Sequence, residues 1–217
     1  ANGWTQPTII TDKNDTIANG GPTLAYNDGQ WLLAWESRVD GLDGQAEDFN
    51  VNYVWFDDDD DRFNIIDTKT ISAARAPDVA PAPDDGFHLA YADLGPGTVA
   101  DADADRRHGS VTVETFDANR SNTQTKQYSV TRFADLDVTT TGIGWIDANT
   151  SEPVSLADRP NGSTGFGAVT SPPINPPSVT QSMELESNNN TLIVTTRGTA
   201  SETGISRTSY TARVDNN

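Results

Sequence analysis

The sequence contains no cysteine, so neither a disulfide bond nor thiol chemistry contributes to this protein. No apolar run approaches the ~20 residues that a transmembrane helix needs, and we therefore expect no membrane insertion. The Gly-x-Ser-x-Gly elbow, the phosphate-binding loop and the His-x-x-x-His pair are absent, which removes three common signatures of enzymes. No signal peptide is present, and the abrupt start at Ala1 is what we expect of a mature, processed chain.

Basic residues are scarce, since 14 Lys and Arg stand against 32 Asp and Glu in 217 residues and leave a formal net charge of −18. The sequence shows no basic stripe, so we expect no binding to nucleic acid. An excess of short carboxylates keeps a surface hydrated, and at molar salt a Debye length of ~3 Å screens their repulsion. The composition predicts a salt-adapted source; an ordinary acidic secreted protein is the alternative.

A hairpin over residues 21–35 organises the rest of the chain. Two apolar runs flank Asn27-Asp28-Gly29, and Asp-Gly between such runs is among the strongest hairpin signals. Weaker copies recur over residues 77–91, 135–145 and 178–195. Aligned at Trp35, Tyr91, Trp145 and Thr195, the second strands end 56, 54 and 50 residues apart. The residues left over at the two ends add up to one further period, as in a closed ring with its seam inside a repeat.

Each hairpin is followed by a long connection and a third alternating strand. These third strands are expected over residues 49–56, 110–116, 164–169 and 205–214, and a fourth strand over residues 63–71 and 126–131. Four strands per repeat, arranged radially, form a β-propeller blade, and the pattern resembles the β-propeller superfamily over the whole chain. We therefore predict one all-β domain over residues 1–217, a four-bladed β-propeller of four-stranded antiparallel blades. The blades are expected at about 13–72, 73–131, 132–176 and 177–217 plus 1–12.

The N-terminal segment is predicted to close the ring. Residues 4–11 resemble a fourth strand, and the last repeat has no fourth strand of its own. Pairing with residues 205–214 would cover an edge of unpaired backbone groups. The alternative is strand exchange, in which this segment completes the last blade of a neighbouring molecule and builds an assembly.

Three carboxylates follow the aligned ends of second strands: Glu36, Asp93 and Asp147. Because the long second-to-third connections share one face of a propeller, these residues are candidates for a site at that long-loop face. Propeller glycosidases use such a trio, so the resemblance implies glycoside hydrolysis as one alternative. Hydrated strand ends or cation ligands are the other interpretation, and the sialidase-type Ser-x-Asp-x-Gly-x-x-Trp box is absent.

A calcium loop is suggested by the alternating carboxylates Asp101, Asp103 and Asp105. An EF-hand loop would have Gly at the sixth position and Glu at the twelfth, where this chain has Arg106 and Thr112. The match is therefore partial, and a solvated acidic loop is the alternative. Calcium is the one cofactor that the sequence suggests.

The remaining candidates are one histidine and a set of sequons. His88 lies in an expected strand beside Phe87 and Leu89, which favours a structural role. Asn-x-Ser/Thr sequons mark glycosylation candidates at Asn14, Asn119, Asn149, Asn161 and Asn189.

Together these features favour a non-enzymatic binding or structural module, secreted or displayed at a cell surface. Its expected partner is a protein or a neutral glycan, and it would serve as a subunit of an extracellular or viral assembly. The alternative is a carbohydrate-binding lectin or a glycoside hydrolase that uses the long-loop face.

The charge balance makes stability depend on salt. We expect the melting temperature to rise steeply from low to molar salt, because screening relieves the repulsion among carboxylates. Thermal unfolding in a series of sodium chloride concentrations measures this. A melting temperature that is independent of salt would contradict the salt-adapted interpretation.

Overall fold

The computed structural model describes residues 11, 17–39, 49–59, 62–93, 109–131, 133–147, 154–159, 166–171, 180–188, 191–200 and 204–213. Every regular element in this part of the chain is a β-strand. None of the described residues belongs to a helix that is long and apolar enough to cross a membrane.

The first sheet contains the hairpin that organises the sequence. Its strands are β1 (Ile17–Asn27), β2 (Gln30–Val39), β3 (Phe49–Asp59) and β4 (Arg62–Ser72). Neighbours in the order β1-β2-β3-β4 pair antiparallel. Asp28 and Gly29 form the predicted turn with positive φ angles of 40° and 79°, the conformation that suits a two-residue hairpin.

The other sheets repeat this plan and confirm the predicted all-β fold of antiparallel sheets. The second sheet contains β5 (Ala74–Pro81), β6 (Phe87–Asp93), β7 (Gly109–Phe116) and β8 (Asn122–Val130). The third contains β9 (Phe133–Val138), β10 (Gly142–Asp147), β11 (Val154–Asp158) and β12 (Val169–Thr170). The last contains β13 (Thr180–Asn188), β14 (Thr191–Ala200) and β15 (Gly204–Arg213), three strands among the described residues.

The third sheet corrects one strand assignment. We expected its third strand over residues 164–169, but that strand is β11, inside the stretch that we had assigned to a loop. β11 is only five residues long and has Pro153 and Pro160 close to its two ends in the sequence, yet its Val154 and Leu156 are buried. Within residues 166–171, the described part of this segment, Val169 and Thr170 pair at the edge as the two-residue strand β12.

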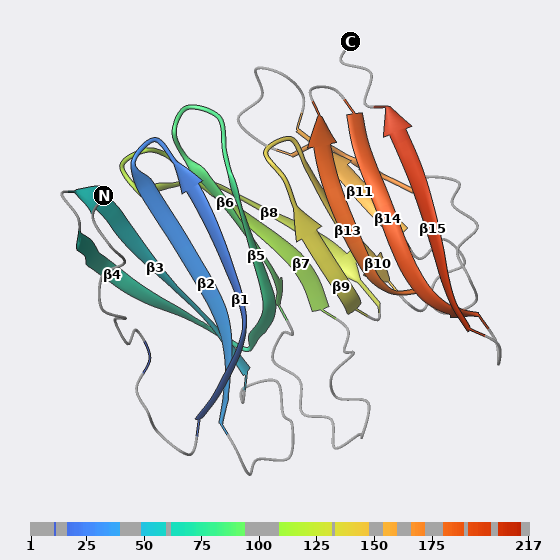
Figure 1. Ribbon diagram of the computed structural model, residues 1–217, viewed down its shortest axis with the longest axis horizontal. Helices are drawn as coiled ribbons and strands as arrows, with labels where there is room; N and C mark the ends of the chain where they lie inside the picture. Colours follow the sequence, from blue (N-terminus) through green and yellow to red (C-terminus); the bar gives the residue numbers. More distant parts are fainter. Residues whose placement is uncertain are drawn as a thin grey trace, which may run out of the picture.

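The four sheets lie side by side, with β1–β4 and β13–β15 at opposite ends of the row (Figure 1). Their first strands β1, β5, β9 and β13, called the inner strands below, lie next to one another in succession. Successive sheets bury apolar side chains between them. Leu32, Trp55, Phe87 and Leu89 lie between the first two sheets, and Met183 and Leu185 pack on the third.

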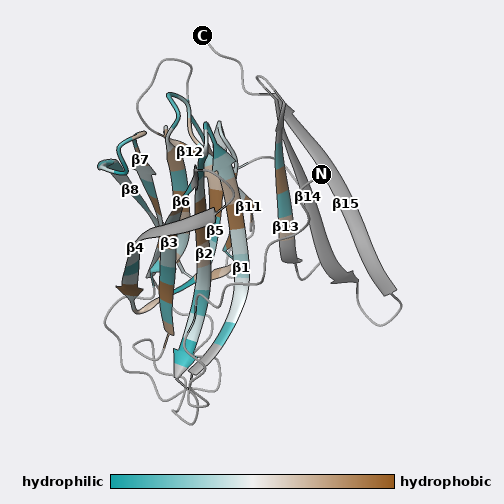
Figure 2. Cartoon of the chain, turned by 60° about the vertical axis from the view of Figure 1, so that its left-hand side comes forward, coloured by the Kyte–Doolittle hydropathy of each residue, from teal (hydrophilic) through white to brown (hydrophobic). Residues whose placement is uncertain are grey.

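Hydropathy follows this arrangement of layers. Apolar residues lie mainly along the middle of the strands, and hydrophilic residues gather toward strand ends and turns, as at the lower ends of β1 and β2 (Figure 2). The described part of the last sheet, of which β13 carries the coloured residues, stands beside the other three. The ends of the strands are therefore the polar surface on which a binding site can form.

A bulge recurs in the inner strands of the first two sheets. The register shifts between Gly20 and Thr23 in β1 and between Arg75 and Asp78 in β5. Gly21 and Ala76 have positive φ angles of 56° and 49°, and each precedes a proline. Pro22 and Pro77 therefore lie at bulges inside these strands, where we had expected them to start the strands.

Pro81 and Pro83 lie at the second hairpin. Pro81 is the last residue of β5, in register with Phe87, and Pro83 belongs to the turn. Because β5 is the edge of its sheet, a residue without a backbone N–H is tolerated there.

The predicted closure of the ring involves residues outside the described part of the chain, since residues 1–10 are not among those described. Pairing of that segment with residues 205–214, the strand-exchange alternative and the blade boundaries stay predictions.

Two substitutions, one at each bulge, test whether the left-handed backbone conformation there is strained. Gly21→Ala should destabilise the protein by about 1–2 kcal/mol, because a Cβ atom disfavours the left-handed conformation. Nothing lies within 4 Å of that Cβ position, so the effect isolates the backbone. Ala76→Gly should give a smaller gain, because the greater freedom of unfolded glycine offsets part of the relief.

Chemical denaturation of both variants beside the wild type measures the two free energies. Equal and unchanged stability of the two variants would show that the bulges are not strained.

Candidate functional site

The second strands of the first three sheets each hold one of the predicted carboxylates at or near their end. Glu36 lies near the end of β2, where its Oε2 atom accepts the Ala76 N–H at 2.9 Å and lies 3.4 Å from Arg75 Nε. The Arg75 guanidinium also lies over the Phe49 ring, 4.8 Å from its centroid. Glu36 thus links the first sheet to the bulge in β5, the first strand of the second sheet.

Asp93 and Asp147 are the last residues of β6 and β10. Asp147 is buried, and its Oδ2 atom accepts the Thr131 N–H at 2.7 Å, so it holds the connection between the second and third sheets. Asp93 is half-buried. The structure therefore places the three carboxylates at the same end of three successive sheets. They are not at equivalent positions, because Glu36 directly follows Trp35, whereas Asp93 and Asp147 stand two residues after Tyr91 and Trp145. Their convergence on one ligand stays a prediction.

Several other sequence candidates lie outside the described residues. These are Asp101, Asp103 and Asp105 of the calcium loop, and the sequons at Asn14, Asn149, Asn161 and Asn189. Asn119 is described and exposed, in the turn between β7 and β8, where Asp117 Oδ1 accepts its N–H at 2.9 Å. Among the described residues, no three His, Cys, Asp or Glu side chains are grouped so that they could hold a metal ion.

A set of carboxylates that sequence reasoning did not single out links the inner strands. Asp78 of β5 accepts the Thr23 hydroxyl of β1 at 2.7 Å through Oδ1 and the Val138 N–H of β9 at 2.8 Å through Oδ2. Asp137 of β9 accepts the Leu185 N–H of β13 at 2.6 Å. One side chain per interface thus binds the backbone of the next inner strand, an arrangement that we call the latch.

Between the first and second sheets, a hydroxyl group takes the place of the carboxylate, because Thr23 Oγ1 of β1 accepts the Val79 N–H of β5 at 3.4 Å. The latch residues Thr23, Asp78 and Asp137 directly precede Leu24, Val79 and Val138 in the sequence. Asp135 adds a second bond to the last sheet by accepting the Met183 N–H at 2.9 Å. The latch therefore defines which positions correspond between sheets.

Partial burial raises the pKa of two of these carboxyl groups, those of Asp135 and Asp137. Burial, a hydrogen bond with Asp78 and the charge of Asp78 raise the pKa of Asp137 from 3.8 to about 8. Burial also raises the pKa of Asp135, against the effect of the N–H groups of Met183 and Leu136. At neutral pH a protonated Asp137 can donate to the Asp78 carboxylate, which keeps two acids in contact without repulsion.

A raised carboxyl pKa is typical of general acids, but the latch does not have the geometry of glycoside hydrolysis. Carboxyl groups that cleave glycosides lie about 5 Å or more apart, because the reacting sugar or a water molecule occupies the space between them. Asp78 and Asp137 are in direct hydrogen-bond contact, and both bind backbone N–H groups. The arrangement suits a structural latch better than an acid–base pair.

His88 is fully buried in β6. Its Nδ1 atom lies 3.0 Å from Thr115 Oγ1, and its ring packs edge-on against Phe166 at 4.8 Å. Burial, with a smaller effect of the Arg159 charge, lowers the pKa of His88 to about 3. The imidazole is neutral at physiological pH, which agrees with the structural role expected from the sequence.

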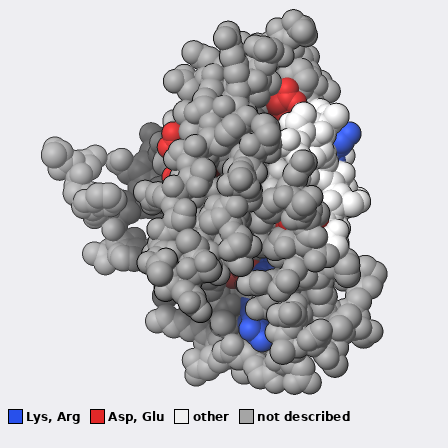
Figure 3. Space-filling view, turned by 90° about the vertical axis from the view of Figure 1, so that its right-hand side faces the viewer, with Lys and Arg blue, Asp and Glu red and all other residues white. Residues whose placement is uncertain are grey.

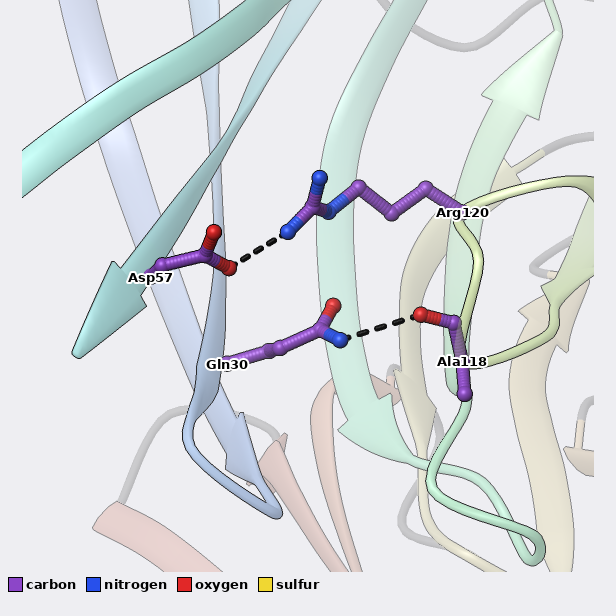
Figure 4. A network of polar contacts seen from close by, with 4 residues as sticks. All are labelled: Gln30, Asp57, Ala118 and Arg120. Atoms are coloured by element: carbon purple, nitrogen blue, oxygen red, sulfur yellow. Dashed lines mark hydrogen bonds and ion pairs between the residues drawn. The ribbon is translucent and has the colours of Figure 1, made fainter. Parts of the chain in front are cut away.

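The opposite end of the first interface is held by polar contacts. Arg120, in the β7–β8 turn, forms an ion pair with Asp57 of β3, and Gln30 Nε2 of β2 donates to the Ala118 carbonyl at 3.0 Å (Figure 4). The first two sheets are therefore linked at both strand ends, by Glu36 at one and by Asp57 and Gln30 at the other.

Seen from the side of the last sheet, the described acidic and basic side chains appear at several separate places (Figure 3).

The comparisons with known proteins concern the fold. No family model matches the chain, and no curated protein matches it in sequence. An α-L-arabinofuranosidase from Fusarium graminearum, in complex with an iminosugar inhibitor, superposes with a TM-score of 0.56 at 13% identity, over 90% of this chain and 58% of that chain. The hemagglutinin-neuraminidase ectodomain of parainfluenza virus 5 gives a TM-score of 0.53 at 9% identity, over 89% and 52%.

Levansucrase from Bacillus subtilis gives a TM-score of 0.50 at 10% identity, over 96% of this chain and 72% of that chain. These neighbours support the β-propeller fold class predicted from the sequence. The chain spans little more than half the length of the first two proteins. The number of blades in the ring stays a prediction.

The latch makes stability depend on pH through Asp137. Because its pKa is raised on folding, the unfolded chain loses the proton first. The free energy of unfolding should therefore fall as the pH rises from about 4 to about 8. Asp137→Asn keeps an acceptor for Leu185 and a donor for Asp78 without a charge. It should gain more than about 1 kcal/mol over the wild type at pH 8, and much less at pH 4.

Urea unfolding at both pH values measures the difference. Asp85→Asn, in an exposed turn, is the matched control and should leave the pH dependence unchanged. A wild-type profile that Asp137→Asn does not flatten would refute this role of Asp137.

Proposed function

We propose that this chain is an extracellular, salt-adapted glycan-binding module that uses the end of the propeller where the second strands finish. The observation that carries the proposal is that Glu36, Asp93 and Asp147 lie at the same end of the second strands of three successive sheets. Carboxylates fixed in this way are acceptors for sugar hydroxyl groups, and the net charge of −18 favours neutral over anionic glycans.

Glu36 and Asp147 are already oriented by the protein. Glu36 is held by Ala76 and Arg75, and Asp147 by Thr131. Preorganised acceptors lose little conformational entropy on binding, which favours affinity. The same contacts occupy oxygens that a nucleophile or general base would need, so they favour binding over hydrolysis.

The neighbours in fold support a sugar ligand. An arabinofuranosidase, a neuraminidase and a levansucrase are all named for reactions of sugars. The viral hemagglutinin-neuraminidase also fits display of such a fold at a surface. Glycoside hydrolysis by the long-loop face is the second candidate function, because that face joins the ends of the second strands to the third strands.

Calorimetry at molar sodium chloride tests the proposal with neutral oligosaccharides, including arabinofuranosides, sucrose and levan fragments. We expect binding in the millimolar range or tighter, and Asp93→Asn should weaken it about tenfold, the effect of one lost hydrogen bond to a charged group. Asp28→Asn, in the turn at the opposite end of the first sheet, is the control and should bind as the wild type does.

Two results would contradict the proposal. Absence of binding to every neutral glycan would remove the ligand class. Release of reducing sugar from the same probes would replace the binding module with the hydrolase alternative.

A further inference from the structure

The first two sheets meet through apolar side chains at the end where the turns between first and second strands lie, called the turn end below. Leu32 and Trp55 of the first sheet are buried there against Phe87 and Phe116 of the second. The Trp55 ring packs edge-on against both phenyl rings, with centroid distances of 5.2 Å and 5.4 Å. Apolar side chains are therefore enough to fill a sheet-to-sheet interface at this end of the repeat.

Between the second and third sheets, polar residues hold the equivalent positions. Leu32 and His88 are equivalent, because each pairs with the residue two places after its latch residue. On β3, Trp55 is the partner of Leu32. On β7, Thr115 is the partner of His88, so Trp55 and Thr115 are equivalent as well.

In the third sheet, Arg159 takes the position of Phe116. Gly142 and His88 are equivalent, since each directly precedes the residue that pairs with the position after the latch residue. Phe116 lies one residue beyond the partner of His88 in β7. Arg159 lies one residue beyond the partner of Gly142 in β11. We call the three polar residues at these positions the turn-end cluster: His88, Thr115 and Arg159.

The turn-end cluster is buried between the sheets but is not fully paired. His88 and Thr115 are buried, and His88 Nδ1 lies 3.0 Å from Thr115 Oγ1. Arg159 is held by its backbone N–H, which donates to the Thr141 carbonyl at 2.7 Å. Its charge contributes to the lowered pKa of His88, so the two side chains lie close together. His88 Nε2 and Arg159 Nε and Nη1 are buried and make no hydrogen bond with any residue that the structure describes.

An arrangement of this kind is unfavourable unless something else binds there. Burying a guanidinium group without an acceptor costs free energy, and the apolar residues of the first interface avoid that cost at the same three positions. Burial lowers the pKa of Arg159, and the charge of Asp84 in the exposed turn before β6 opposes this effect. Asp84 makes no hydrogen bond to Arg159 Nε or Nη1, so it does not supply the acceptor.

We propose that the turn-end cluster binds a small monovalent anion, either a chloride ion or a carboxylate group of similar size. The unpaired nitrogen atoms are all donors, because a Thr115 hydroxyl that donates to His88 Nδ1 leaves the imidazole proton on Nε2. Arg159 supplies one positive charge and charge-assisted hydrogen bonds. A chain of net charge −18 opposes an anion of higher charge. Arg159 is only half-buried, so the anion can reach the guanidinium from the turn end.

This inference does not depend on the proposed glycan site. His88 is near the start of β6 and Asp93 is its last residue, so the two sites lie at opposite ends of the sheets. The inference is also distinct from the general effect of salt. Screening acts with every salt, whereas an anion bound at one site stabilises only when that anion is present.

Broadening of the chlorine-35 NMR signal of sodium chloride on addition of the protein measures chloride binding directly. The wild type should give a saturable broadening, and Arg159→Gln should weaken the affinity about tenfold or more, the effect of losing a hydrogen bond to a charged group. Arg38→Gln is the matched control and should bind as the wild type does, because it removes another half-buried guanidinium, which lies over Phe49 at the opposite end of the sheets. Calorimetry with sodium formate on the same variants shows whether the site takes a carboxylate, a halide or both.

Denaturation in sodium chloride, formate and gluconate at equal ionic strength separates binding from a structural role of Arg159. In gluconate, whose anion is too large for an enclosed site, Arg159→Gln should be at least as stable as the wild type, because it removes an unpaired buried charge. In the salt whose anion binds, the wild type should be the more stable of the two. Arg159→Lys, which keeps the charge but has fewer donors, should bind with intermediate affinity and provides the same comparison if Arg159→Gln does not fold.

Two results would overturn the proposal. One is that wild type and Arg159→Gln bind both chloride and formate equally, or that neither anion binds, since anions would then meet the surface alone. The other is that Arg159→Gln loses the same stability in all three salts, which would show that the guanidinium only holds the two sheets together.

Discussion

The structure depends on hydrogen bonds that inner-strand side chains make to the backbone of the next sheet. Each sheet satisfies its own backbone, so apolar contact alone would let neighbouring sheets slide past one another. Thr23, Asp78 and Asp137 fix the register, because each oxygen finds one particular N–H group in the next inner strand. The cost is partial burial of carboxyl groups, which the protein offsets by keeping Asp137 protonated beside Asp78.

Much of the architecture could be predicted from the sequence because the hairpins have strong local signals. Asp28-Gly29 requires a turn whatever surrounds it, and period-two alternation identifies the long strands. The same reasoning failed at β11, whose five residues are too few for alternation to outweigh the prolines on either side. Bulges at Pro22 and Pro77 were also missed, because a bulge depends on the register with the neighbouring strand. The bulge at Pro77 also depends on the hydrogen bond from the Ala76 N–H to Glu36.

The latch shows why the site was only partly predictable. Asp78 and Asp137 stand in similar contexts, Pro77-Asp78-Val79 and Leu136-Asp137-Val138, and an acid inside an apolar strand was the available signal. This signal can be interpreted only when the stacking of the sheets is known, because the partners of these acids lie about one repeat away in sequence. Glu36, Asp93 and Asp147 were found because each closely follows the aromatic residue at which the second strands were aligned. This feature is local in the sequence and can be recognised without knowledge of the packing.

The distribution of carboxylates separates structural from binding roles. A protein with a large acidic excess has many carboxylates, so their presence in a strand or at its end says little about catalysis. What distinguishes them is which strand each one binds. Asp78 and Asp137 accept N–H groups of the next inner strand, whereas Glu36 and Asp147 accept N–H groups near the ends of second strands. The acids of the inner strands therefore fix the register between sheets, and those at the strand ends lie where a ligand bound at that end would meet them.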